Sequence, residues 1–185
     1  MKKRILVVAA MAVVAIAAAV VVYAQLFNLN PSTRLRGFEE VPAISTNGNG
    51  QFNARIHQGF IEWELFYGQL ESPVTQAHVH FGQKDVNGGI SFFLCSNLPN
   101  PPAGTQPCPP NGGFIRGITM PTDIIGPAGQ GIEPGAFNEV LEAMRAGNTY
   151  ANIHTIRFPN GEIRGQINGE DHNNHINGEN GSIIR

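Results

Sequence analysis

Residues 60–67 read Phe-Ile-Glu-Trp-Glu-Leu-Phe-Tyr, and apolar and polar side chains alternate along most of this stretch. A period of two is typical of a β-strand that buries one face, because successive side chains point to opposite sides of a sheet. The buried face then contains Trp63, and the opposite face carries Glu62 and Glu64. The stretch therefore predicts a strand with Trp63 in the hydrophobic core.

The same pattern continues on both sides of this strand. Residues 51–56 form a second predicted strand, and Gln58-Gly59 between the two fits the tight turn of a hairpin. Gly, Asn and Pro recur about every eight to twelve residues along the chain, as in a β-sandwich. Further strands are expected at residues 77–81, 89–94, 113–120, 150–158 and 162–168.

One segment has helical periodicity instead. In residues 136–146, apolar side chains recur at the spacing of one helix face, and Gly147 follows as a C-terminal cap. The apolar stripe consists of Phe137, Val140, Leu141 and Met144. Together these patterns predict a mostly β protein, an antiparallel Greek-key-like β-sandwich with one short helix that covers an end of the sandwich.

The N-terminus has the pattern of an export signal. Basic residues are followed by an apolar run over residues 5–22, and Val22 and Ala24 occupy the positions that a signal peptidase reads. The run also approaches the roughly 20 residues that span a bilayer, so an uncleaved N-terminal anchor is the alternative. Either way, we expect an exported protein (secreted, periplasmic or at the cell surface) that contacts a membrane only through this segment.

We expect one domain, preceded by two accessory segments and followed by a third. The segments are a signal peptide or anchor at 1–24, a linker at 25–34, the domain at 35–168 and a polar tail at 169–185, which buries too little apolar surface to become ordered. The chain carries a formal net charge of −2, and its Lys and Arg residues are scattered. This distribution argues against nucleic-acid binding.

The chain has two cysteines, Cys95 and Cys108, which lie in one Pro-rich stretch. Cysteines in an oxidising compartment are expected to pair, and a bridge across a loop of this size stabilises a fold by about 3 kcal/mol in the chain-entropy model. The alternative is two free thiols. A disulfide is the interpretation that fits the export signal.

Residues 76–82 read Gln-Ala-His-Val-His-Phe-Gly and contain the strongest chemical signal of the chain. On a strand, His78 and His80 share one face, while the apolar residues that alternate with them face the core. Two imidazoles at this spacing can both reach one metal ion from the outer face of a sheet.

A third histidine, His154, is expected to point outward from its own strand. The turn that follows it fits a three-residue hairpin with Gly161 in the left-handed region. This register places His154 beside Gln166, on the face of Arg164 and Glu162. The last three residues are therefore candidates for binding an anion or for positioning the histidines.

Each of these residues also has a purely structural interpretation. His78 and His80 can be solvent-facing strand residues that are hydrogen-bonded to neighbours, and His154 can anchor its hairpin by bonding to a backbone carbonyl. Glu162 and Arg164 can form an ion pair with each other or with neighbours. Of the other histidines, His57 is expected to be exposed near a hairpin turn, and His172 and His175 in the tail are expected to make adventitious contacts. Glu62 and Glu64 lie on a predicted solvent face, so the paired carboxylates of a glycoside hydrolase are not supported.

Several ordered motifs resemble the CHRD (chordin-type) domain family. They are residues 35–42, with the sequence Leu-Arg-Gly-Phe-Glu-Glu-Val-Pro, residues 77–82, and residues 150–155, which run on to 161–167. Such domains occur in animal chordin and in many exported microbial proteins, usually without an assigned activity. The resemblance therefore implies a fold and an exported location more than it implies a function.

A weaker similarity is to copper-zinc superoxide dismutases, in which a His-x-His strand and other histidines of an antiparallel sandwich hold copper. By this similarity, His78, His80 and His154 match three copper ligands, and Arg164 matches the residue that guides the anion. The chain departs from those enzymes because it has no histidine placed to bridge two metals and no His-rich loop with an aspartate after Gly82. The similarity implies a single metal site, with copper favoured over zinc.

Two functions from different classes follow. The first is a non-catalytic extracellular module that binds an unidentified partner or one metal ion through the outer face of the sheet. The alternative is a copper-dependent redox enzyme that acts on superoxide. The missing bridging and zinc ligands favour the first. Because protonated imidazole cannot bind a metal, affinity is expected to fall below about pH 6.5.

Overall fold

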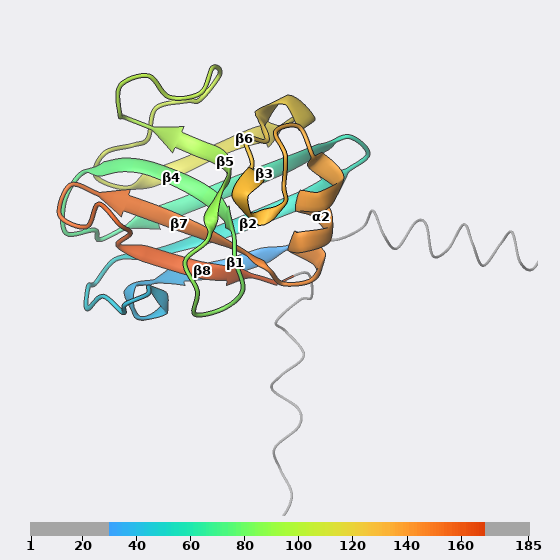
Figure 1. Ribbon diagram of the computed structural model, residues 1–185. Coiled ribbons are helices and arrows are strands. Elements are labelled where there is room, and N and C mark those ends of the chain that lie inside the picture. Colours follow the sequence, from blue (N-terminus) through green and yellow to red (C-terminus); the bar gives the residue numbers. More distant parts are fainter. Residues whose placement is uncertain (1–29, 169–185) are drawn as a thin grey trace, which may run out of the picture.

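The computed structural model describes residues 30–168 (Figure 1). The expected signal segment and the polar tail lie outside these residues. The strands are β1 (Ser32–Arg36), β2 (Asn49–His57), β3 (Phe60–Gly68), β4 (Val74–Phe81), β5 (Gly89–Ser96), β6 (Gly113–Thr119), β7 (Thr149–Thr155) and β8 (Ile163–Ile167). The helices are α2 (Phe137–Arg145) and the short 3₁₀ helices η1 (Gly37–Glu39), η2 (Pro121–Asp123) and η3 (Ala128–Gln130).

All eight strands belong to one sheet, in the order β5-β4-β7-β8-β1-β2-β3-β6, and every neighbouring pair is antiparallel. The sheet curls so that its two halves face each other around a common core (Figure 1). The expected mostly β, antiparallel fold with one helix is therefore confirmed. The two layers of the predicted sandwich are halves of one continuous sheet, joined where β8 lies beside β1.

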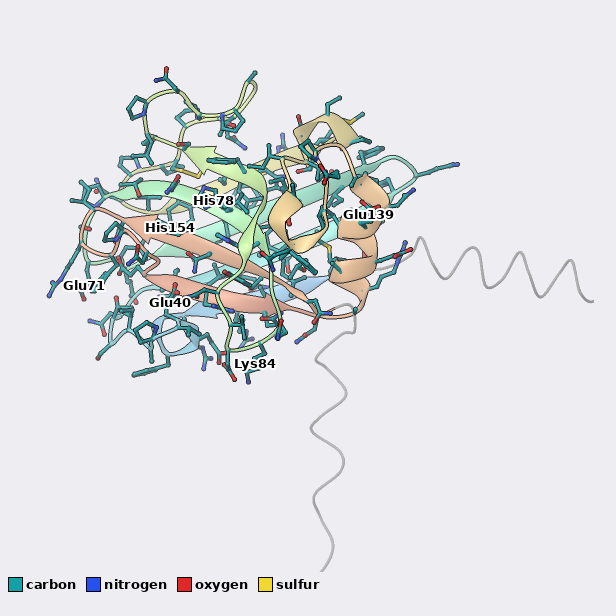
Figure 2. The ribbon with its side chains drawn as sticks, viewed as in Figure 1. Glu40, Glu71, His78, Lys84, Glu139 and His154 are labelled. Atoms are coloured by element: carbon teal, nitrogen blue, oxygen red, sulfur yellow. A yellow bond between two sulfur atoms is a disulfide. The ribbon has the colours of Figure 1, made fainter. Side chains whose placement is uncertain are left out.

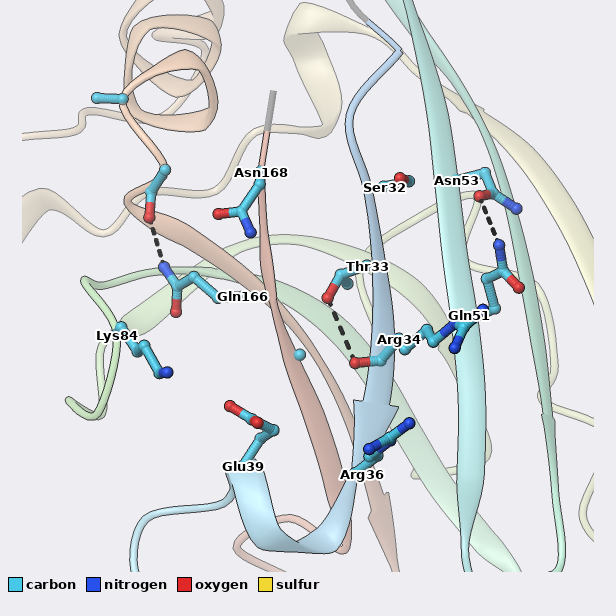
Figure 3. Close-up of a pocket in the computed structure, with 13 residues that line it drawn as sticks. Ser32, Thr33, Arg34, Arg36, Glu39, Gln51, Asn53, Lys84, Gln166 and Asn168 are labelled. Atoms are coloured by element: carbon cyan, nitrogen blue, oxygen red, sulfur yellow. Dashed lines mark hydrogen bonds between the residues drawn. The ribbon is translucent and has the colours of Figure 1, made fainter. Parts of the chain in front are cut away.

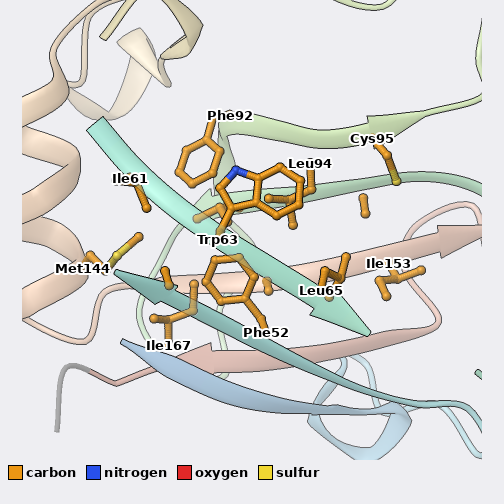
Figure 4. Packing of buried hydrophobic residues seen from close by; sticks show 14 of the residues in the cluster. Phe52, Ile61, Trp63, Leu65, Phe92, Leu94, Cys95, Met144, Ile153 and Ile167 are labelled. Carbon is orange, nitrogen blue, oxygen red and sulfur yellow. The ribbon is translucent and has the colours of Figure 1, made fainter. Parts of the chain in front are cut away.

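The hairpin of β2 and β3 has the predicted form. His57 pairs with Phe60, which leaves a two-residue turn, and Gly59 has the positive φ of +93° that such a turn requires. Trp63 is buried in the core among Phe52, Leu65 and residues of the opposite half of the sheet (Figure 4). Its indole Nε1 donates a hydrogen bond to Thr119 Oγ1 at 3.0 Å, so the polar atom of this large buried ring is satisfied.

Helix α2 covers one end of the curled sheet (Figure 1). The predicted stripe is buried in full: Phe137, Val140, Leu141 and Met144. Gly147 follows the helix with φ +69°, which is the left-handed conformation expected of a C-terminal cap. No helix among residues 30–168 combines the length and the apolar composition needed to cross a bilayer.

The Pro-rich stretch closes the seam between the two edge strands, β5 and β6. Cys95 and Cys108 form the predicted disulfide. Between them, the Gln106 side chain donates hydrogen bonds to Leu94 O of β5 at 3.4 Å and to Arg116 O of β6 at 3.1 Å. The segment thus occupies backbone acceptors that an open sheet edge exposes to other chains.

Two boundaries differ from expectation. Strand β1 starts at Ser32, before the expected domain start at Leu35, because backbone pairing with β2 begins there. The hairpin of β7 and β8 is wider than the predicted three-residue turn, since β7 ends at Thr155 and β8 starts at Ile163. Tyr150, not His154, consequently lies opposite Gln166.

Candidate metal centre

Strand β4 separates apolar and imidazole side chains as the sequence predicts. Ala77 and Val79 belong to the hydrophobic core, and His78 and His80 alternate with them on the other face of the strand. The pairing of β4 with β5 shifts register between Ala77 and His78 and again between Val79 and His80. Such irregularities bend a strand and redirect its side chains, and they often accompany functional sites.

Strand β7 brings the third histidine beside these two. His154 lies directly opposite Gln76 in the pairing of β4 with β7, and Gln76 is two residues before His78, so His154 and His78 share one face of the sheet (Figure 2). His78 Nδ1 and His154 Nε2 are 3.2 Å apart. One ring nitrogen from each of His78, His80 and His154 lies within 4.8 Å of the others. The three predicted residues therefore meet at one point, although they are far apart in the sequence.

The spacing is somewhat wider than that of a bound site. A zinc or copper ion held at about 2.0 Å by each nitrogen needs nitrogens roughly 3 to 4 Å apart. The pair His78 and His154 already meets this requirement. The cluster as a whole, at 4.8 Å, has to contract by about 1 Å to hold an ion.

Two backbone carbonyls fix the orientation of two of the rings. His80 Nδ1 donates to Gly88 O at 3.0 Å, and His154 Nδ1 donates to Pro159 O at 3.0 Å. A proton at Nδ1 makes Nε2 the accepting nitrogen of each neutral ring; His154 Nε2 faces His78 Nδ1, and His80 Nε2 has no partner among the described residues. Metal-binding histidines usually have this arrangement, in which the second ring nitrogen is anchored by a carbonyl or carboxylate.

The buried ring nitrogens are not all satisfied within the protein. His78 Nε2 and His80 Nε2 are buried without a hydrogen-bond partner among the described residues. A buried polar atom without a partner costs about 1–3 kcal/mol, so native proteins keep few of them. A ligand that coordinates imidazole nitrogen accounts for the unpaired Nε2 of His80, whereas the nitrogen by which His78 faces the cluster is Nδ1.

All three rings are buried, with relative exposures of 0% for His78, 8% for His80 and 7% for His154. Burial lowers the pKa of each ring, and the neighbouring histidines lower the pKa of His78 further. For His80 the pKa falls to about 4, although the hydrogen bond to Gly88 opposes the fall. The cluster is thus held neutral at physiological pH, which is the form that binds metals.

The predicted outer face is correct, but this face is covered and not open to solvent. Tyr150 stacks on His80 with ring centroids 4.8 Å apart and nearly parallel planes. The guanidinium carbon of Arg164 lies 3.7 Å from the centre of the Tyr150 ring. Because β7 lies between β4 and β8, Tyr150 separates the histidines from Arg164.

The loop that connects β4 to β5 completes the cover. Arg164 donates from Nη1 to Asn87 Oδ1 and from Nη2 to Val86 O, and Asn87 in turn donates to Val41 O. Gly88 N donates to Tyr150 Oη at 3.0 Å. A Cβ atom at Gly88 would collide with the carbonyl of Phe81, so this position requires glycine.

The three residues proposed for anion binding or positioning have structural partners instead. Glu162 does not pair with Arg164, and its carboxylate accepts from Thr46 Oγ1, Thr155 Oγ1 and Glu71 N. Arg164 is only 2% exposed, so it is not placed to guide an anion from solvent.

Gln166 donates to Gly82 O and Gly147 O, which holds the start of the covering loop. Gln166 was predicted to lie beside His154, but in the structure it lies opposite Tyr150. The prediction failed because Thr155 and Glu162 close the connecting loop with a hydrogen bond of 2.7 Å, and Glu162 is held by distant residues that a local turn pattern does not show.

Sequence reasoning missed a buried carboxyl group near the cluster. Glu40 accepts a hydrogen bond from Asn152 Nδ2 at 2.9 Å. Burial raises the pKa of Glu40 to about 7, although Arg164 and Asn152 act in the opposite direction. Glu40 lies in the first of the motifs that resemble the CHRD family, and Asn152 shares the predicted outward face of β7 with His154. The sequence therefore pointed to each residue, but it did not show that the two are in contact.

The remaining histidines stay apart from the cluster. His57 stacks on Phe60 at the tip of the β2–β3 hairpin and lies 3.4 Å from Glu62 Oε2. His172 and His175 lie outside the described residues. Within residues 30–168, His78, His80 and His154 form one group of His, Cys, Asp or Glu side chains close enough to hold a metal, and no further such group is found there.

The chain was compared with protein-family profiles, with curated proteins and with solved structures. Neither the curated proteins nor the solved structures contain a significant match to the chain. The CHRD domain family profile matches residues 32–167, which is most of the chain and includes all eight strands and the three histidines. The chain therefore belongs to the CHRD domain family.

Proposed function

We propose that this protein is an exported, non-catalytic CHRD module that binds one metal ion through His78, His80 and His154. One observation carries the proposal: three buried, neutral imidazoles converge within 4.8 Å, and two of them are anchored at Nδ1 by backbone carbonyls. Structural histidines rarely need such an arrangement, whereas a metal site requires both the convergence and the anchoring.

Copper is the metal that we propose, with zinc second. A set of three imidazoles suits either ion, and divalent copper binds a given nitrogen site more tightly than zinc does. No carboxylate or thiolate belongs to the cluster, so hard cations such as magnesium and calcium are poor candidates.

The cover over the cluster supports a holding role more than redox catalysis on superoxide. A catalytic metal keeps one coordination position open to substrate. Here Tyr150 stacks on His80, and Arg164 is turned toward Tyr150 and the covering loop. These contacts cover the rings on the side of His80, where a substrate of a redox enzyme would need access.

Export and an extracellular partner complete the proposal. The Cys95–Cys108 disulfide fits an oxidising compartment, and the apolar N-terminal pattern fits a signal segment. An unidentified partner that uses the outer sheet face is compatible with the metal site, because the three rings lie below the surface.

A competition titration of the purified protein with Cu(II) and Zn(II) at pH 7 tests the metal proposal. The expected result is one Cu(II) per chain, held more tightly than Zn(II). His154→Ala should weaken binding about 100-fold or more, because it removes a ligand. His57→Ala is the matched control, since His57 is a partly exposed histidine outside the cluster. Equal affinity in both variants would refute the site.

A further inference from the structure

A polar cavity of ≈ 890 Å³ lies on the outer face of the sheet, separate from the histidine cluster (Figure 3). Its walls come from β1, β2, β8, the loop after β4 and the residues that follow helix α2. We call it the basic groove, and it is defined by Arg34, Arg36, Glu39, Gln51, Asn53 and Lys84. Its volume is in the range of sites that bind extended small ligands.

The groove carries unbalanced positive charge. Arg34, Arg36 and Lys84 line it together with one acidic residue, Glu39, and in Figure 3 Glu39 lies between Lys84 and Arg36. Within residues 30–168, the side chains of the three basic residues make no ion pair, since the ion pairs found there involve other residues. Three free cations gather in this groove although the chain as a whole is acidic.

The pairing of β1 with β8 also brings two positively charged residues together at the groove. Arg36 of β1 lies directly opposite Arg164 of β8. Like charges directly opposite each other on neighbouring strands are destabilising. Arg164 turns away toward Tyr150 and Val86, which leaves Arg36 exposed at the groove and outside any ion pair found among residues 30–168, with Glu39 as the one acidic residue of the lining.

The lining also restricts the kind of anion. No aromatic and no large aliphatic side chain lines the groove, so bases and lipid chains find nothing on which to pack. Amide and hydroxyl groups are present instead, among them Gln51, Asn53 and Thr33, and these groups bind sugar hydroxyls. β1 is paired on both sides, so an acidic peptide cannot add to it as a further strand.

The spacing of the cations favours repeated single charges over one compact anion. Arg34 and Arg36 point to the same face, about 7 Å apart along the strand, and Lys84 approaches from the loop on the other side. Guanidinium groups bind carboxylates with two parallel hydrogen bonds. We propose that the basic groove binds an acidic oligosaccharide whose successive sugars carry carboxylates.

Calorimetric titration of the full chain with a hexamer of galacturonic acid tests this proposal. A neutral glucose hexamer and a short polyglutamate peptide are the comparison ligands. We expect the uronate hexamer to bind and the neutral hexamer to bind at least about tenfold more weakly. Added salt should lower the affinity for the uronate, because salt screens exposed charges.

Variants locate the binding. Arg34→Gln combined with Arg36→Gln should weaken uronate binding about tenfold or more, and Lys84→Gln should weaken it several-fold. Arg116→Gln is the matched control, because Arg116 is an exposed arginine on β6, outside the groove. All four positions are exposed, and thermal unfolding checks that the variants are folded.

Three results would overturn the proposal. The first is equal affinity for the uronate and the neutral hexamer. The second is an equal loss of uronate binding in Arg116→Gln, which would mean diffuse attraction by surface charge. The third is polyglutamate binding as tight as uronate binding, which would identify the groove as a site for acidic peptides.

Discussion

Gly88 connects the covering loop to the histidine cluster. Its carbonyl accepts from His80 Nδ1, and its amide donates to Tyr150 Oη. The same residue has no room for a side chain, because a Cβ would collide with the Phe81 carbonyl. One backbone position therefore sets both the orientation of His80 and the position of the ring that stacks on it.

Gly88→Ala should damage the metal site without removing a ligand. The loop has to move to admit the methyl group, so the hydrogen bond that fixes His80 is lost or lengthened. We expect metal affinity to fall about 10- to 100-fold, as for other losses of a group that anchors a ligand, and stability to fall by about 1–3 kcal/mol. Titration calorimetry and denaturant unfolding measure these changes.

Gly129→Ala is the control for this experiment. No atom lies within 4 Å of a Cβ added at Gly129, so the variant should resemble the parent in both measurements. If Gly88→Ala binds metal as tightly as Gly129→Ala does, the carbonyl of Gly88 does not position His80.

The buried titratable groups predict how stability depends on pH. In the unfolded chain the histidines titrate near 6.5, and in the folded chain burial lowers the pKa of all three. Between these values the unfolded state binds more protons, so the free energy of unfolding falls as pH drops below 6.5. Each excess proton contributes about 1.4 kcal/mol per pH unit.

Glu40 acts in the opposite direction. Its pKa rises from 4.5 to about 7 on folding, so between these pH values the folded state binds the extra proton. This proton offsets the loss of stability that one of the three histidines causes. Denaturant unfolding of the metal-free protein between pH 6.5 and 4.5 should show the net loss of stability, and Glu40→Gln should make that loss steeper. An unchanged slope in Glu40→Gln would show that Glu40 is ionised in the folded protein.

Low histidine pKa values also change the expected pH dependence of metal binding. The sequence alone predicts a fall in affinity below about pH 6.5, the ordinary histidine value. Because the pKa of His80 in the folded protein is about 4, protons compete with the metal only at lower pH, as long as the protein stays folded.

Helix α2 and the Pro-rich stretch stabilise the curled sheet at different places. The helix buries its apolar stripe against one end of the core, and the disulfide segment bridges the edge strands β5 and β6. Each element therefore removes from solvent a surface that the sheet alone would leave open.

Leu141→Ala should reduce the free energy of unfolding by about 2–5 kcal/mol, because it leaves a cavity between α2 and the core. Chemical denaturation measures the loss. Glu142→Ala, at the exposed neighbouring position of the same helix, should change stability by at most about 0.5 kcal/mol. Similar small losses in both variants would show that the helix does not contribute to the core.

Cys108→Ser should destabilise the protein by about 2–5 kcal/mol, the usual effect of losing a native bridge in a small exported domain. Reduction of the parent protein should give a similar loss and provides the control. Mass spectrometry of protein from its native compartment should show Cys95 joined to Cys108. Alkylation of both cysteines without prior reduction would contradict the bridge.

Sequence periodicity predicted the elements whose residues interact locally. The alternation in β3 and the stripe of α2 each reflect one buried face, which is visible within a few residues. The register of β7 and β8 was wrong because contacts of Glu162 with Thr46 and Glu71 determine the loop. These partners are distant in the sequence, so no local turn rule contains them.

The residues of the candidate site also fall into those that local sequence patterns predict and those that they do not. The face of His78 and His80 follows from strand alternation, and the position of His154 depends only on β7 pairing with β4. Glu40, Tyr150 and Gly88 come from three separate segments that meet only in the folded protein. Their contacts follow from the curvature of the sheet and the path of the covering loop, which the sequence pattern does not specify.

The curled sheet gives the domain two chemically different sides. Its inner face holds the apolar core, whereas its outer face carries the covered histidines near β4 and β7 and the basic groove near β1 and β8. The loop after β4 borders both sites, since Gly88 bonds to His80 and Lys84 lines the groove. The two proposed sites thus lie on one sheet and offer different chemistry.

The central claim is that His78, His80 and His154 hold one metal ion. The most direct measurement is a crystal structure of the copper-loaded protein, with anomalous scattering recorded at the copper absorption edge. We predict one strong peak, with a nitrogen of each of the three rings at about 2.0 Å. A copper peak at other residues, or the absence of a peak between these rings at saturating copper, would contradict the account.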